Sequence, residues 1–191
     1  MNFWLALRFC GILCLAYILS PLSLSAQSPY TGRLEVDMDA LAIARGGYGV
    51  RLAYQSNHVR LGASSFDHRL PALVIGERNV SIRTSGIGFG ADYFVHASRG
   101  IFLGLHTAFH EEALRRVTTE ETAQRKSIEA GLQAGYRWSF GRESENLRGL
   151  FLESALAVTT RLDGRPLTLG SSVYETPAVA IQPTLRMGYR F

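Results

Sequence analysis

The stretch "AVAIQPTLRMGYRF", residues 178–191, alternates strictly between two kinds of side chain. From Val179 to Phe191 every second residue is apolar or proline, and the residues between them are small, polar or charged. Successive side chains of a strand point to opposite faces, so this pattern predicts a strand with one apolar and one polar face. Chain termini usually fray. An alternation that persists to the last aromatic residue therefore indicates an end that is held within a sheet.

The same period of two recurs along most of the chain. The other alternating segments are residues 32–40, 47–55, 59–65, 86–95, 101–110, 127–140 and 149–161. Most have about the 9–11 residues with which a tilted strand crosses a bilayer. We therefore predict an all-β fold, an eight-stranded antiparallel up-and-down barrel that spans a membrane.

The connections between these segments alternate in length. Short connections lie at residues 56–58, 96–100 and 141–149, and long ones at residues 67–81, 111–126 and 163–177. The first connection, around Arg45 and Gly46, is short and breaks the trend. Short turns on one side and long loops on the other are typical of outer-membrane barrels. Residues 111–126 either extend the neighbouring strands above the membrane or form a surface-binding loop, and a solvated extension without a partner fits equally well.

The first 26 residues have the pattern of a secretory signal peptide. Arg8 precedes an apolar run over residues 9–19, and small residues at positions 23, 25 and 26 follow it. The run is too short for a comfortable membrane anchor. We expect a signal peptide over residues 1–26 and a barrel domain over residues 27–191. Both cysteines, Cys10 and Cys14, lie in the signal, so the exported domain needs a source of stability other than disulfides.

The charge of the chain excludes a nucleic-acid partner. The formal net charge is only +4, and Lys126 is the only lysine among 20 basic residues. Arginine suits paired, partly desolvated sites better than lysine does. No block of basic residues is present. The cations are therefore expected in ion pairs rather than on a nucleic-acid-binding surface.

The polar face of the predicted strands combines small residues with charges of both signs. Small residues allow a narrow interior, and arginine–carboxylate pairs can fill it. A soluble sandwich or a lipocalin-like barrel would instead turn the apolar face inward, and a small solute pore is a further alternative. The predicted charge network of a filled lumen comprises Glu35, Asp37, Asp39, Arg51, Arg60, Asp92, Glu129, Arg137, Glu153, Arg161, Arg186 and Arg190.

Aromatic residues gather where the predicted strands approach the short turns. Rings with polar edges suit the headgroup region of a membrane, so these residues are expected to form an interfacial girdle. The predicted membrane-interface aromatics are Tyr54, Tyr93, Tyr136, Trp138, Phe140, Tyr189 and Phe191.

Together, the signal pattern, the eight alternating segments, the girdle and the terminal "YRF" resemble the small outer-membrane barrels of the OmpA/OmpX type. The resemblance implies a monomer in the outer membrane that contacts its lipids. It also implies that the barrel-assembly machinery reads the last strand, here through Leu185, Met187, Tyr189 and Phe191. Pro183 departs from the pattern because it removes a ladder donor. It predicts a bulge, or pairing that weakens toward the outer end.

Two sets of residues have the composition, but not the spacing, of a metal or phosphate site. His106 and His110 share a strand face but stand about 13 Å apart at ~3.3 Å per residue, too far for one metal ion. The glycines of "GIGFG", at positions 86, 88 and 90, follow a strand period and not that of a phosphate-binding turn. We expect no metal and no cofactor.

A lipid-modifying enzyme would need a serine, a histidine and an acid in the geometry of a triad. The candidate sets are Asp67 and His68 with Ser64 or Ser65, and Ser56 with His58. Neither has the His-x-Ser-Asn pattern of lipid A deacylases. The sequence therefore predicts a non-catalytic barrel with a structural or surface-interaction role, and the long loops are the place for a surface ligand.

Overall fold

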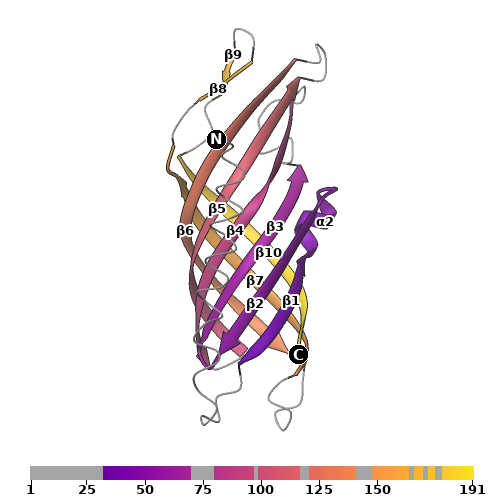
Figure 1. Cartoon of the computed structure of the whole chain (residues 1–191), viewed down its shortest axis with the longest axis vertical. Coiled ribbons are helices and arrows are strands. Elements are labelled where there is room, and N and C mark those ends of the chain that lie inside the picture. The colour runs from indigo at the N-terminus through magenta and orange to yellow at the C-terminus, as the bar shows by residue number, and fades with distance from the viewer. Residues whose placement is uncertain are drawn as a thin grey trace, which may run out of the picture. The chain divides into compact units, whose positions relative to one another are not determined.

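The computed structural model describes residues 32–69, 80–96, 99–116, 121–140, 148–163, 166–169, 172–174 and 178–191. Eight strands form a closed antiparallel barrel in the order β1-β10-β7-β6-β5-β4-β3-β2 (Figure 1). The barrel strands are β1 (Arg33–Asp39), β2 (Tyr48–Ser56), β3 (Val59–Arg69), β4 (Val80–His96), β5 (Arg99–Arg116), β6 (Thr122–Ser139), β7 (Gly149–Arg161) and β10 (Val179–Arg190). The predicted eight-stranded meander is confirmed.

Three further elements accompany the barrel. The helix α2 (Ala40–Ala44) joins β1 to β2, and β8 (Leu167–Leu169) pairs with β9 (Ser172–Tyr174) in a small separate sheet. Among the described residues, no helix has the length and apolar character needed to cross a membrane.

The barrel strands are inclined to the barrel axis. Following strand partners around the barrel from Val36 leads to Val179 on β10, whereas the direct partner of Val36 on that strand is Tyr189. This offset of ten residues is the stagger of the closed barrel, and such a stagger goes with tilted strands. Because the interior of such a barrel is narrow, side chains can fill it.

Three neighbouring strands are longer than the sequence pattern indicated. β4, β5 and β6 contain 17, 18 and 18 residues. Their pairing continues to Val80↔Arg116 and to Arg115↔Thr122. The alternative in which the segment after His110 extends its two strands is therefore confirmed for the described part of the segment.

The first connection is a short helix and not a simple turn. Asp39 caps it, since its Oδ1 accepts a hydrogen bond from the Leu41 N–H at 2.9 Å. At the other end the N–H groups of Gly46 and Gly47 bond the carbonyls of Ile43 and Ala42 at 2.9 and 3.1 Å. Gly46 has φ +72°, which favours glycine at this position. The helix follows β1 and contacts β10, β2 and β3.

Pro183 lies in an unbroken part of β10. The register with β7 runs without a shift from Val179 to Arg190, so the predicted bulge is wrong. Phe191 donates its N–H to Leu34 of β1, which shows that odd-numbered residues of β10 direct their backbone groups toward β1. The pairing of β1 with β10 ends at Asp39↔Arg186. The proline therefore removes no hydrogen bond from the sheet. β10 is paired with β7 on both sides of Pro183, whereas its pairing with β1 stops before Pro183 is reached.

Candidate functional site

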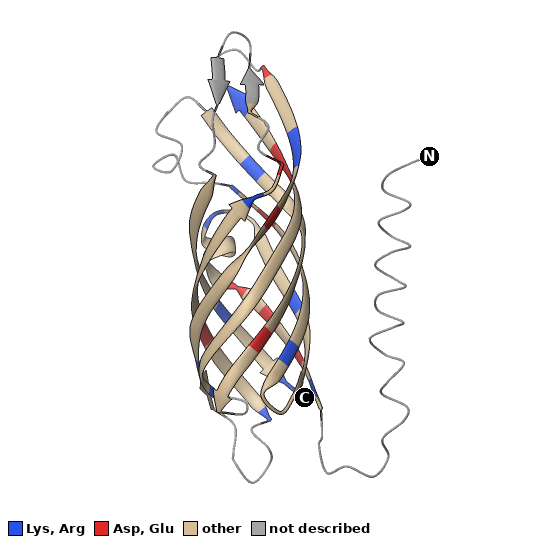
Figure 2. Cartoon of the chain, turned by 90° about the vertical axis from the view of Figure 1, so that its left-hand side faces the viewer, with Lys and Arg blue, Asp and Glu red and all other residues tan. Residues whose placement is uncertain are grey.

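The barrel has its charges inside and its apolar side chains outside. Arg60 and Glu153 are completely buried, whereas Leu103 and Leu132 are 60% and 64% exposed. Figure 2 shows the charged residues distributed along the barrel strands. A soluble barrel would have the opposite arrangement, because burial of apolar surface drives its folding.

Glu153 lies at the centre of the charged lumen. Its Oε2 is 2.6 Å from Nη1 of Arg60 and 2.9 Å from Nη2 of Arg137. Its Oε1 accepts hydrogen bonds from Arg51 at 3.1 Å and from Arg186 at 3.2 Å. One carboxylate thus contacts four guanidinium groups that come from four different strands.

Glu35 forms a second centre nearer the short turns. It accepts hydrogen bonds from Nη1 and Nη2 of Arg137 at 2.8 and 3.0 Å, and from Nε of Arg190 at 2.8 Å. Gln55 Oε1 accepts from Arg190 at 2.8 Å and from Arg137 at 3.2 Å. Sequence reasoning missed Gln55, although its parity places it on the lumen face of β2.

The remaining carboxylates of this network each hold one arginine closely. Arg51 Nε donates to Asp37 at 2.8 Å, and Arg60 Nε donates to Asp92 at 2.8 Å. Gln133, which sequence reasoning also missed, donates to Asp92. Asp39, by contrast, caps α2 and makes no ion pair with the lumen arginines of the described strands.

Three phenylalanines lie beside this network. Phe94, Phe102 and Phe151 are almost completely buried. The Arg137 guanidinium carbon lies 4.1 Å from the ring centroid of Phe151, and that of Arg60 lies 4.9 Å from Phe94. Such contacts stabilise a desolvated cation. The alternation puts Phe94 on the polar face, but it does not predict that phenylalanine rings contact the lumen arginines there.

A second polar cluster occupies the lumen toward the long-loop side. Glu112 accepts a hydrogen bond from Arg161 at 2.7 Å and pairs with Arg125. Glu129 accepts a hydrogen bond from Gln182 at 2.9 Å and another from Thr159. Glu129 and Arg161 therefore lie with Glu112 and Arg125, two residues of the expected 111–126 connection, and not with Glu153.

This cluster also brings a serine and a histidine together. Ser127 Oγ and His110 Nε2 are 2.6 Å apart, but His110 Nδ1 and Glu129 Oε2 are 3.7 Å apart. The second distance is too long for the hydrogen bond that orients the histidine of a triad. The three side chains form part of the lumen packing.

The structure does not assemble the serine–histidine–acid sets considered from sequence. Asp67 and His68 are neighbours on β3 and point to opposite faces, and Asp67 is bound to Arg83. His58 Nδ1 lies 2.7 Å from the Phe94 carbonyl oxygen, and its ring stacks on Tyr93. The two candidate sets are therefore wrong. The described residues also contain no group of three His, Cys, Asp or Glu side chains suited to a metal ion.

The predicted interface aromatics lie on the outer face near the short turns. Tyr136 and Trp138 have ring centroids 4.8 Å apart, and Tyr189 and Phe191 have theirs 5.0 Å apart. Of the same predicted set, Tyr93 and Phe140 are exposed and Tyr54 is half-buried.

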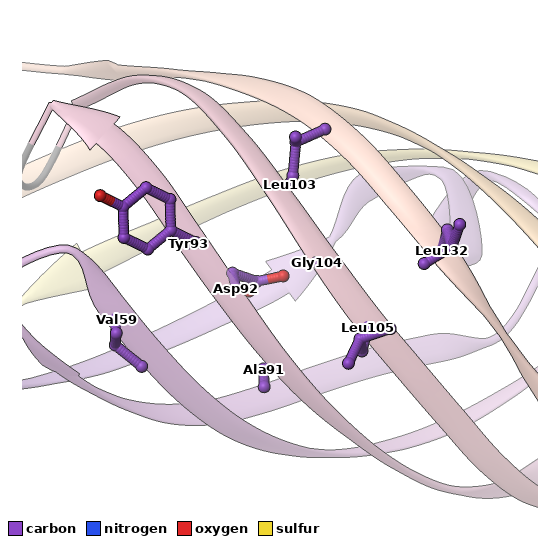
Figure 3. A pocket seen from close by; sticks show the side chains of 8 residues that line it. All are labelled: Val59, Ala91, Asp92, Tyr93, Leu103, Gly104, Leu105 and Leu132. Carbon is purple, nitrogen blue, oxygen red and sulfur yellow. The ribbon is translucent and has the colours of Figure 1, made fainter.

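An open hollow of about 310 Å³ lies on the outer surface beside this aromatic band. Leu103, Leu105, Leu132 and Tyr93 surround it (Figure 3). Ala91, whose side chain is small, leaves room between these larger outward side chains. The hollow is apolar, and a hydrocarbon chain matches its lining better than a polar solute does.

In comparisons with known proteins, the chain is similar to one solved structure. No protein-family model matches the chain, and no curated protein matches it. The chain is similar to the crystal structure of Neisserial surface protein A (NspA), with a TM-score of 0.47 and 15% sequence identity. The match covers 85% of this chain and 96% of that one.

Proposed function

We propose that the protein is a monomeric integral outer-membrane β-barrel with a filled lumen and a structural or surface-interaction role, without catalytic activity. The observation that carries this proposal is the inversion of the barrel, whose apolar side chains face outward and whose ion pairs face inward. Residues 1–26 would serve as the signal peptide and residues 27–191 as the barrel domain, as in barrels of the OmpA/OmpX type.

The outer apolar surface has the extent of a membrane-spanning belt. Outward residues are predominantly apolar over residues 87–95 of β4, 101–109 of β5 and 128–138 of β6. Such segments correspond to a belt about 25 Å tall when strands are tilted. The next outward residues are Ser85, Glu111 and Lys126, which are partners across the three strands. The belt therefore has a definite polar edge on the long-loop side.

The filled lumen favours this function over a pore. The two glutamate centres and the three phenylalanines occupy the interior on the short-turn side. A lipid-modifying enzyme is disfavoured because Asp67 and His68 point to opposite faces and His58 is bound to the Phe94 carbonyl oxygen. Mass spectrometry of lipid A from cells with and without the protein tests that alternative, and a changed acyl composition would contradict the non-catalytic proposal.

The partners in this proposal are outer-membrane lipids and, during biogenesis, the barrel-assembly machinery. A surface ligand would bind through the long loops, parts of which lie outside the described residues. The role of the loops stays a prediction.

Migration on SDS gels tests the membrane barrel most directly. We expect the unheated protein from the membrane fraction to migrate differently from the boiled protein, because a closed barrel resists unfolding by the detergent. A protein recovered in the soluble periplasmic fraction without such a shift would contradict the proposal.

A further inference from the structure

Two arginines face outward just above the polar edge of the belt. Arg69 on β3 and Arg83 on β4 are direct cross-strand partners, and both are exposed. Such partners have Cβ atoms about 4.5–5.5 Å apart, and like charges in this position are destabilising. An arrangement of this kind is stable when an anion lies between the two guanidinium groups.

Asp67 satisfies only part of this pair. Its two carboxylate oxygens accept hydrogen bonds from Arg83 Nε at 2.7 Å and from Arg83 Nη2 at 2.6 Å. These hydrogen bonds lower the pKa of Asp67 below its ordinary value of 3.8, so the carboxylate stays charged at neutral pH. The contact holds Arg83 in place. Its Nη1 makes no hydrogen bond to the residues that the structure describes.

Arg69 has no corresponding carboxylate. Its side chain makes no hydrogen bond or ion pair with the residues that the structure describes. Two cations therefore share one anion at the surface. A second anion with several oxygens would find one guanidinium already oriented and the other available, and planar guanidinium groups bind phosphate oxygens well.

The location of the pair specifies the source of that anion. Along β4, Arg83 is two outward positions beyond Ile87, the last apolar residue of the belt, and Ser85 lies between them. The neighbouring outward residues Phe109 and Ile128 continue the apolar surface on β5 and β6. A lipid whose chains lie against this surface has its headgroup at the level that long arginine side chains reach.

We propose that Arg69 and Arg83 form a binding site for the phosphate group of an outer-leaflet lipid whose acyl chains lie against the belt below. The site rests on the proposed membrane-barrel function and adds a ligand of defined chemistry to it. Asp67 is a positioning residue, because it orients Arg83 and does not itself contact the phosphate.

Native mass spectrometry of the full barrel in nanodiscs can test the site. The nanodiscs contain phosphatidylcholine with a minor fraction of dioleoyl phosphatidate. We expect phosphatidate to be retained at least about tenfold over phosphatidylcholine, because hydrogen bonds between charged groups are worth at least a factor of ten in affinity. The double variant Arg69→Gln/Arg83→Gln should lose this preference. Arg148→Gln, which removes an exposed arginine before β7 at the short-turn side, should keep it.

The controls separate this inference from the membrane proposal. All variants must first show heat-modifiable migration in phosphatidylcholine vesicles, and failure of the wild type at this step contradicts the membrane barrel itself. A folded wild type without a preference for phosphatidate overturns only the lipid site, as does equal retention by the double variant. Inorganic phosphate in excess should not displace the lipid, and displacement would identify a site for free phosphate.

Discussion

At the scale of single residues, Glu153 is unusual because one buried carboxylate is the shared partner of several arginines. Its carboxylate contacts four arginines, and the Glu153 side chain itself is not exposed to solvent. Burying charges is expensive, and the expense is offset only when every charge has close partners. Removing one charged residue therefore lowers stability by more than one ion pair contributes, because its former partners stay buried without a counter-charge.

We expect Glu153→Gln to lower the free energy of unfolding by about 3–5 kcal/mol, because three buried guanidinium groups and the half-buried Arg186 lose their shared anion. Denaturant unfolding in detergent micelles, followed by tryptophan fluorescence, measures the change. Glu121→Gln is the matched control, since Glu121 pairs with Arg116 at an exposed site and should change stability by less than about 1 kcal/mol. Equal effects of the two substitutions would contradict a central role of Glu153.

The sequence predicts the face of these residues but not their partners. Parity along each strand placed Arg60, Arg137 and Glu153 on one face. The pair of Arg137 with Glu35 joins residues 102 positions apart across the lumen. Such a contact depends on the stagger of the closed barrel. The alternation within each strand does not predict that stagger.

At the scale of elements, the ends of the strands were the least predictable part. Above the belt the pattern reverses, because Val80, Ile82 and Leu114 are buried inside while Ser81 and Arg83 point outward. In these strand ends the apolar residues no longer face outward, so their sequence resembles that of a loop. The helix α2, with five residues, is also too short to show a helical period.

The position of Pro183 leads to a prediction about β10. Replacement of Pro183 by Ala should change stability by less than about 1 kcal/mol, because its nitrogen faces the side where pairing with β1 has ended. Thr184→Pro should cost about 3 kcal/mol or more, since residue 184 directs its N–H toward β7. Unfolding in micelles compares the two variants. A loss with Pro183→Ala as large as with Thr184→Pro would contradict this account of the edge.

The last residue of the chain allows a test of the proposed assembly signal. Deletion of Phe191 should reduce insertion into the outer membrane in cells by several-fold, while the shortened protein should still refold in micelles. The amount of heat-modifiable protein in membranes measures the first effect, and refolding yield measures the second. Normal insertion of the shortened chain would argue against a signal at this end.

At the scale of the whole molecule, the closed interior predicts electrical behaviour. The wild-type protein should show no stepwise conductance in planar bilayers, because ion pairs and phenylalanines occupy the lumen. Arg137→Ala removes a side chain that bridges Glu35 and Glu153, and it should open transient conducting states. Arg148→Ala serves as the control with the same loss of charge. Steady conductance of the wild type would support the pore alternative.

The seam between the two ends of the barrel sets a condition on the timing of assembly. The Phe191 N–H bonds the Leu34 carbonyl, so the barrel closes only when β10 pairs with β1. Until that pairing forms, the sheet of the other strands keeps one unpaired edge on β1 and another on β7. Exposed strand edges invite aggregation. The insertion of β10 therefore protects both edges of the sheet in one step.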